Sequence, residues 1–141
     1  MHGHQIAVID DEAFICDLIA EYLGDHGAVV HCANTRDDGI ALLKSRQFAV
    51  VLIDAVLPGG SGLGLLPIAA NAHTPAVIIT GHPDAAGECD RFGVPYLGKP
   101  FGLDALAREA RKVLADREVA LQRMRDAVAK MDAEKGSSAA T

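Results

Sequence analysis

The stretch FAVVLIDAVLPGGSG, residues 48–62, decides the fold of this chain. It opens with an apolar, largely β-branched run at residues 49–53, reaches Asp54 and continues into Pro and Gly. A run this short, ended by Pro and Gly, is typical of a central parallel strand that is covered on both faces. Asp54 therefore stands at the carboxyl end of a buried strand, where open α/β sheets place their ligands. The plainer alternative is an Asp that only caps the following turn.

Composition limits the classes of protein to which the chain can belong. Its 141 residues are 50% hydrophobic, which is enough for one domain with a sizeable core. The net charge of -6 argues against nucleic acid as a direct partner. No apolar run approaches the roughly 20 residues of a membrane span and no signal peptide is present, so we expect a cytoplasmic protein. Cys16, Cys32 and Cys89 are widely spaced, which predicts reduced thiols rather than a metal or redox site.

Strand and helix patterns alternate along the chain. We expect strands at residues 4–9, 28–32, 49–53, 76–79 and 94–97, and helices at residues 12–26, 35–46, 61–72, 83–92 and from 103 onward. Gly64 and Pro67 make the third helix irregular, so it should start late or be kinked. Short connections between alternating elements imply right-handed crossovers. The sequence therefore predicts an α/β fold with a five-stranded parallel sheet and helices on both faces.

Polar residues follow four of these strands. Asp10 and Asp11 follow the first, Asp54 the third, Thr80 the fourth and Lys99 the fifth. In a flavodoxin-like, doubly wound sheet of order 2-1-3-4-5, strands one and three are neighbours, so their acids converge. Carboxylates about 4 Å apart repel by roughly 4 kcal/mol at an effective dielectric of about 20, which favours a bound divalent cation. Oxygen ligands from few protein groups suit Mg²⁺, and the lysine and threonine suit phosphoryl oxygens.

Four short segments carry a resemblance to a known family. They are VIDDE at residues 8–12, DAVLPGGSG at 54–62, IITG at 78–81 and YLGKPF at 96–101. Each is weak alone, but the four are specific in this order and at these strand ends. From residue 5 to about residue 115 the chain resembles the receiver domain of bacterial two-component response regulators. We therefore divide it into a receiver domain at residues 1–115, a helical extension at 116–135 and a disordered tail at 136–141.

The resemblance implies a role for each matching residue. Asp54 matches the phosphoacceptor and is also one of the Mg²⁺ ligands. Asp11 matches the direct Mg²⁺ ligand, Asp10 an acid that holds the metal largely through water, and Val56 a further ligand through its backbone carbonyl. Thr80 matches the switch hydroxyl, Lys99 the phosphoryl-binding lysine and Tyr96 the switch aromatic. A cis bond between Lys99 and Pro100 is also implied. Thr80 and Tyr96 have a plainer interpretation as ordinary strand residues. Glu12 is interpreted as a first-turn acid of the next helix.

The chain departs from the family pattern in two places. Ser61 stands where the family often has Asp or Asn. The span between Thr80 and Lys99 is shorter than is usual, and it holds two Gly and two Pro in residues 83–95. The fourth helix and fifth strand are the family's usual signalling surface, so output in the common mode is in doubt.

The resemblance implies a signalling module that accepts phosphate from a histidine kinase on Asp54 with Mg²⁺, and that catalyses only its own phosphorylation and dephosphorylation. A second interpretation is a phosphorelay intermediate that passes the phosphate to a histidine phosphotransfer protein. A third, a haloacid-dehalogenase-like phosphatase with Asp10 as nucleophile, is disfavoured because that family needs an Asp where this chain has Glu12. No output domain fits in residues 116–141, so we expect a stand-alone receiver or one cut from a longer protein.

The last helix is unusually long. Helix-forming residues continue from Leu103 to Lys135 and predict one continuous helix, with Arg117 as the charged exception in an apolar heptad stripe. The stripe consists of Ala107, Ala110, Leu114, Leu121, Met124, Val128 and Met131. An isolated tail helix would be marginal in water, so the stripe needs a partner. We hypothesise a homodimer through this helix; the alternatives are a tail that folds back on its own domain and a linker to a missing output domain.

Overall fold

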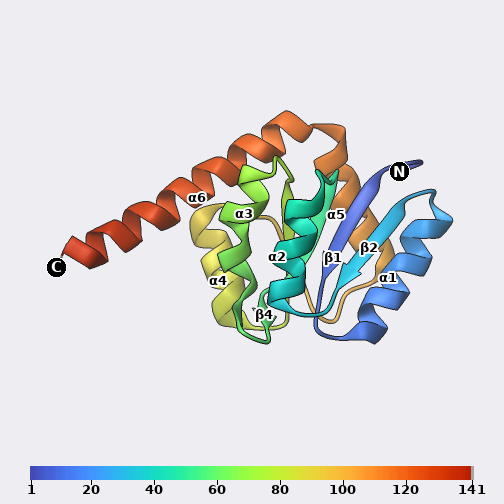
Figure 1. The fold of residues 1–141 in the computed structure, drawn as a ribbon, viewed down its shortest axis with the longest axis horizontal. Coiled ribbons are helices and arrows are strands. Elements are labelled where there is room, and N and C mark those ends of the chain that lie inside the picture. Colours follow the sequence, from blue (N-terminus) through green and yellow to red (C-terminus); the bar gives the residue numbers. More distant parts are fainter. Residues whose placement is uncertain (141) are drawn as a thin grey trace.

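The computed structural model describes residues 1–140, with side chains described for residues 1–134, and is built on one five-stranded parallel sheet (Figure 1). The strands are β1 (Gln5–Ile9), β2 (Val29–Ala33), β3 (Val50–Asp54), β6 (Ala76–Thr80) and β7 (Tyr96–Gly98). They lie in the order β2-β1-β3-β6-β7, and each neighbouring pair is parallel. Counted along the chain, this is the predicted order 2-1-3-4-5, so the flavodoxin-like prediction is confirmed.

Helices cover both faces of the sheet. Helices α1 (Ala13–Asp25) and α5 (Leu103–Ala115) lie on one face, and α2 (Arg36–Ser45), α3 (Leu66–Asn71) and α4 (Pro83–Phe92) lie on the other. Strand β3 is buried along its whole length because its side chains alternate between the two hydrophobic clusters. Val51 and Ile53 belong to the α2–α4 side, whereas Val50 and Leu52 belong to the α1–α5 side. This explains the unbroken apolar run that precedes Asp54.

Local signals explain the helix boundaries on the α2–α4 side. The Thr35 hydroxyl accepts the Asp38 N–H at 3.1 Å and so caps the start of α2. The third helix begins late, as predicted, after a 3₁₀ turn at Gly62–Leu65. Pro67 then falls in the first turn of α3, where its missing N–H has no helical partner to lose. The segment expected to be a loop after Asp54 forms a small antiparallel hairpin of β4 (Val56–Leu57) and β5 (Gly60–Ser61).

The C-terminal segment corrects the prediction of one continuous helix. Helix α5 ends at Ala115, Asp116 leaves the helical conformation with φ -142 and ψ 78, and α6 (Arg117–Ala140) starts in a new direction. The carboxylate of Asp116 accepts the Val119 N–H at 3.3 Å and so caps the start of α6. The break contains neither Gly nor Pro, so distant contacts must impose it.

The prediction of a disordered tail from residue 136 also differs from the structure, in which α6 reaches Ala140. Adding a residue to an existing helix costs the conformational freedom of one residue and gains one hydrogen bond. Propagation beyond the docked part of α6 is therefore much less costly than starting a new helix. Thr141 lies outside the described residues.

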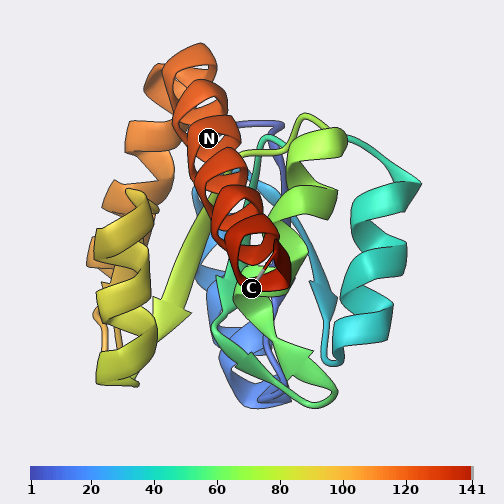
Figure 2. The same ribbon diagram turned by 90° about the vertical axis from the view of Figure 1, so that its left-hand side faces the viewer.

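Helix α6 docks on the chain's own domain. It crosses α3 and α4 and its far end extends beyond the globular body (Figures 1 and 2). Leu121, Met124 and Ala127 are buried in the cluster of the α2–α4 side. Ala107 and Ala110 are buried on the opposite face of the sheet, against α1. The predicted heptad stripe is therefore divided between two cores, and the fold-back alternative describes this structure better than a homodimer seam.

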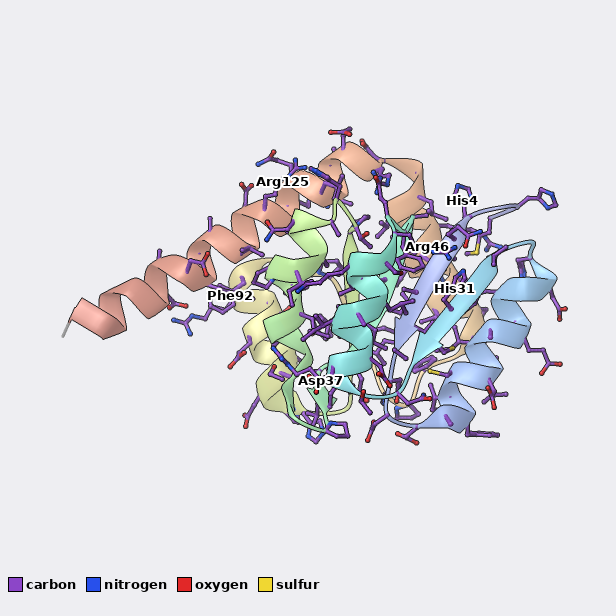
Figure 3. All side chains as sticks on the ribbon, viewed as in Figure 1. His4, His31, Asp37, Arg46, Phe92 and Arg125 are labelled. Carbon is purple, nitrogen blue, oxygen red and sulfur yellow. The ribbon has the colours of Figure 1, made fainter. Side chains whose placement is uncertain are left out.

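Polar contacts hold α6 where Arg117 interrupts the apolar stripe. The Arg117 guanidinium donates to the carbonyl oxygen of Phe48 at 3.2 Å and to that of His73. These carbonyls directly precede β3 and β6, so Arg117 joins α6 to the sheet at the edge where its strands begin. Further along the helix, the Arg125 Nη2 lies 3.1 Å from the His73 ring, and Arg91 of α4 pairs with Glu134. Figure 3 labels Arg125 on α6 and shows it above the end of α3.

Docking of α6 predicts a large cost for truncating Leu121, which is 2% exposed. Leu121→Ala should lower the free energy of unfolding by about 2–5 kcal/mol, as other buried Leu-to-Ala changes do. Urea denaturation followed by circular dichroism measures this change. Lys130→Ala, on the exposed side of the same helix, is the control and should cost less than about 0.5 kcal/mol. Equal, small losses in the two variants would mean that α6 is undocked in solution.

Candidate functional site

Three charged side chains meet at the carboxyl edge of the sheet. The Lys99 Nζ lies 3.0 Å from the Asp54 Oδ2 and 3.3 Å from the Asp10 Oδ2. Strands β1 and β3 pair directly, with Ile9 opposite Ile53, so the next residue on each strand is an acid and the two acids are neighbours. The loop after β7 brings the lysine between them. The convergence expected from the order of the strands is thus observed.

Backbone donors orient both carboxylates. Asp10 is fully buried, and its Oδ1 accepts the Glu12 N–H at 2.9 Å. Asp54 is 5% exposed, and its Oδ1 accepts the Val56 N–H at 3.1 Å. In each case one oxygen is held by the chain two residues later and the other faces Lys99. The Asp54 Oδ2 is therefore presented to the lysine in a defined direction.

Burial and charge shift the titration of this group. Burial raises the pKa of Asp10, the hydrogen bond from Glu12 lowers it, and the nearby charge of Asp54 raises it again, so that the net shift is upward. Burial alone would lower the pKa of Lys99, but the hydrogen bond to Asp54 and the charge of Asp10 outweigh it and raise that pKa. The lysine therefore stays charged, whereas the buried carboxylate is destabilised in its ionised form. An additional cation would relieve that cost.

Three consecutive acids form a candidate cation site at the same edge. Asp10, Asp11 and Glu12 each offer an oxygen, and these oxygens lie within 4.8 Å of one another. Asp10 is buried while Asp11 and Glu12 are exposed, so the cluster runs from the interior to the surface. Oxygen donors with room for water are what Mg²⁺ requires, so the residues fit this ion. The sequence interpretation of Glu12 as a helix-start acid was incomplete, because its carboxylate also lies 3.6 Å from Lys99.

Two residues outside the predicted set shape the site. A Cβ on Gly62 would lie 1.9 Å from the Asp54 carbonyl oxygen, so only glycine lets this loop pack against the backbone that presents Asp54. The Gly62 N–H also donates to the Ala55 carbonyl at 2.8 Å. Asn34 donates from its side chain to the Asp10 carbonyl at 2.9 Å. A single Asn after a strand is too common a signal for the sequence alone to have assigned it here.

Thr80 stands beside the acids but turns to its own loop. It ends β6 and is 2% exposed, and the register pairs the preceding residue, Ile79, with Asp54. Its hydroxyl accepts the His82 N–H at 2.9 Å, at the start of α4. Among the described side chains no hydrogen bond joins Thr80 to Asp54. The position suits a group that can respond to a change at Asp54 and transmit it to α4.

Tyr96 and Val56 lie at the margins of the site. The Tyr96 hydroxyl donates to the Asp90 carboxylate of α4 at 3.4 Å, and the charge of Asp90 raises the pKa of the tyrosine. Val56 is 50% exposed, and its backbone N–H is already bound to Asp54. The bond between Lys99 and Pro100 is cis, as the sequence predicted.

Residues 6–111 match the response regulator receiver domain. The chain belongs to this family. It is 31% identical over 130 residues to the nitrogen assimilation regulatory protein NtrX of Azorhizobium caulinodans, which covers 87% of this chain and 28% of the relative. It is 32% identical over 112 residues to the transcriptional regulatory protein DltR of Streptococcus agalactiae, which covers 76% of this chain and 50% of the relative. The receiver thus spans half or less of the length of these two curated relatives.

Solved receivers have the same fold. A CheY-like receiver domain protein from Methanospirillum hungatei superposes with a TM-score of 0.75 at 25% identity, covering 82% of this chain and 97% of the other. The receiver domain of NtrX from Brucella abortus gives a TM-score of 0.70 at 33% identity, covering 79% and 98%. Within residues 1–140 no helix of this receiver is long and apolar enough to cross a bilayer.

The raised pKa of Asp10 gives a pH-dependent prediction. The folded receiver binds the Asp10 proton more tightly than the unfolded chain, so this stabilisation is present at acid pH and is lost as the pH rises through the raised pKa. At pH 7 without Mg²⁺, Asp10→Asn should therefore raise the melting temperature. The gain should shrink as the pH falls toward 3.8, the ordinary pKa of the group.

Thermal denaturation at several pH values measures this difference. Asp17→Asn, an exposed change on α1, is the control and should have little effect at any pH. A lower melting temperature for Asp10→Asn at pH 7 would show that the ion pair with Lys99 outweighs the cost of burial.

Proposed function

We propose that this receiver accepts a phosphoryl group on Asp54 from a histidine kinase in the cytoplasm, with Mg²⁺ held at Asp10 and Asp11. The observation that carries the proposal is the 3.0 Å contact between the Lys99 Nζ and the Asp54 Oδ2 at the end of a buried strand. A carboxylate is a competent nucleophile toward phosphorus when cations neutralise the phosphoryl oxygens. Membership of the receiver family supports the same role.

Transfer requires the Asp54 side chain to attack in line with the bond that breaks. One Asp54 oxygen attacks the phosphorus of a phosphohistidine, the P–N bond breaks, and the imidazole leaves as the neutral ring after taking up a proton. The Val56 N–H keeps the other oxygen in place, which limits the freedom of the nucleophile. Lys99 already lies beside the attacking group and supplies a fixed positive charge to the transferred oxygens.

The acids of β1 supply the metal side of the site. Mg²⁺ bound by Asp10, Asp11 and the Val56 carbonyl would neutralise charge on the phosphoryl oxygens. The 4.8 Å grouping of acidic oxygens supports this assignment, and so does the upward pKa shift of Asp10, which comes first from burial and then from the charge of Asp54. Glu12 lies close enough to pair with Lys99 at 3.6 Å and would compete with Asp54 for the lysine.

An apolar surface beside the site suits the phosphate donor. Phe14 is 70% exposed on the first turn of α1. Next to it, Ile15, Leu18 and Phe101 line a cleft between α1 and the cis Lys99–Pro100 loop. We propose that a helix of the histidine kinase docks along this surface, because a donor seated there would reach the open carboxyl edge. A histidine phosphotransfer protein would use the same site.

Phosphorylation would act through charge. An aspartyl phosphate adds about two negative charges at the end of β3. Thr80 is adjacent and holds the turn that starts α4, so reorientation of its hydroxyl toward the phosphate would disturb that turn. Tyr96 contacts α4 through Asp90 and is placed to follow the change. The function proposed is that of a regulatory switch that modifies only itself.

Replacement of the nucleophile gives a direct test. Wild-type protein incubated with acetyl phosphate and Mg²⁺ should gain the mass of one phosphoryl group, whereas Asp54→Asn should gain none, because an amide is a poor nucleophile. Intact-mass spectrometry measures the gain. Asp84→Asn, an exposed acid on α4, is the control and should be phosphorylated like the wild type. Phosphate gain by Asp54→Asn would place the acceptor elsewhere.

The metal role of Asp11 has its own test. Asp11→Ala removes a carboxylate of the cation cluster and should abolish Mg²⁺ binding in a calorimetric titration. It should also slow phosphorylation at least about tenfold, the scale on which disturbed metal sites lose activity. Asp17→Ala, an exposed acid on the following helix α1, is the control. Normal phosphorylation of Asp11→Ala would exclude this residue as a required ligand.

A further inference from the structure

Two of the three cysteines lie together behind the acidic cluster. Cys16 on α1 is 1% exposed, whereas Cys32 on β2 is exposed. The Cys32 Sγ lies 3.6 Å from the Cys16 carbonyl oxygen and donates to it, so the exposed thiol sits against the residue that carries the buried one. Their wide spacing in the sequence predicted reduced thiols rather than a redox site, because only the packing of α1 against β2 brings the two residues together.

The buried thiol also touches the backbone of the site. The Cys16 Sγ donates to the Asp10 carbonyl at 3.7 Å. The side-chain amide of Asn34 lies 3.5 Å from the Cys16 Sγ and donates to the same carbonyl at 2.9 Å. Cys16, Asn34 and the Asp10 carbonyl thus form one small network directly beneath the acids.

This arrangement matches the chemistry of thiol sensors. An oxidant reaches an exposed thiol first, and a second thiol beside it then resolves the oxidised sulfur as a disulfide. Cys32 is the exposed member, and the neighbouring Cys16 side chain lowers its pKa, which favours the reactive thiolate. Cys89 differs, because it is fully buried and that burial raises its pKa to about 11.

We propose that Cys32 and Cys16 form a disulfide on exposure to hydrogen peroxide and that this disulfide slows phosphorylation of Asp54. The Cys32 sulfur attacks one peroxide oxygen, the O–O bond breaks, and the departing hydroxide takes up the thiol proton as water. The Cys16 sulfur then attacks the resulting sulfenic acid, the S–O bond breaks, and the hydroxide leaves as water with the Cys16 proton. The two thiols lose two electrons and two protons, and the peroxide is reduced to two waters.

The link to phosphorylation rests on the proposed function of Asp54. Disulfide formation removes the S–H that Cys16 donates to the Asp10 carbonyl and draws its sulfur away from Asn34. The segment that carries the metal-binding acids thereby loses one of its hydrogen bonds. We expect the oxidised protein to be phosphorylated about two- to tenfold more slowly, because this is the change in rate that the loss of one hydrogen bond typically causes.

Peptide mapping tests the disulfide without reference to phosphorylation. Full-length protein is treated with hydrogen peroxide, alkylated and digested without reductant. The expected product joins the peptides of Cys16 and Cys32, is reversed by dithiothreitol, and leaves Cys89 alkylated. Cys16→Ala, checked for folding by circular dichroism, should instead leave Cys32 as a sulfenic acid that dimedone traps. Free Cys16 together with an overoxidised or intermolecularly linked Cys32 in the wild type would overturn the proposal.

Phosphorylation of the oxidised protein tests the regulatory half. Acetyl phosphate and Mg²⁺ are added to oxidised wild type, to reduced wild type and to peroxide-treated Cys32→Ser. Only the oxidised wild type should be slow, and dithiothreitol should restore it. Equal rates with the disulfide in place would overturn the link to Asp54. Absence of phosphorylation in the reduced wild type would count against the function proposed for Asp54, while the mass of the disulfide would still decide the thiol chemistry.

Discussion

Crowding of negative charge at one edge of the sheet is the constraint on which this receiver depends. Direct pairing of β1 with β3 sets Asp10 and Asp54 side by side, and both are nearly inaccessible to water. Lys99 offsets part of that charge through contacts of 3.3 Å and 3.0 Å. The cost of burial, and after it the repulsion from Asp54, raise the pKa of Asp10. Because the negative charge is only partly neutralised, a bound cation would stabilise the folded protein.

The carboxyl and amino edges of the sheet differ in how they are covered. The carboxyl edge is left open for ligands, and short loops of acids and glycine shape it. The amino edge is closed by α6, whose Arg117 reaches the carbonyls of Phe48 and His73. Leu121, Met124 and Ala127 of the same helix are buried in the cluster that also contains residues of α3 and α4. Leu121 and Met124, which the sequence placed in a possible homodimer seam, pack within one molecule in this structure.

The site also depends on residues to which the sequence analysis gave no role. Gly62 permits the approach of a loop to the backbone of Asp54, and Asn34 binds the carbonyl of Asp10. Cys16 extends the same network into the core and connects it to an exposed thiol on β2. The acidic residues are therefore held by side chains that are not themselves acidic. A change in one of these side chains can alter the site without altering an acidic residue.

The sequence by itself determined the alternation of strands and helices, the late start of α3 and the acids and lysine at the strand ends, because each follows from patterns within a few residues. The order of the motifs also predicted that Asp54 and Lys99 belong to one site. Only the tertiary structure decided the break at Asp116, since no local residue stops the helix there and docking of α6 imposes it. It also decided the roles of Asn34 and the contact of Cys16 with Cys32. These contacts join segments that are far apart in the chain. The residues around each segment do not determine which distant segment will pack against it.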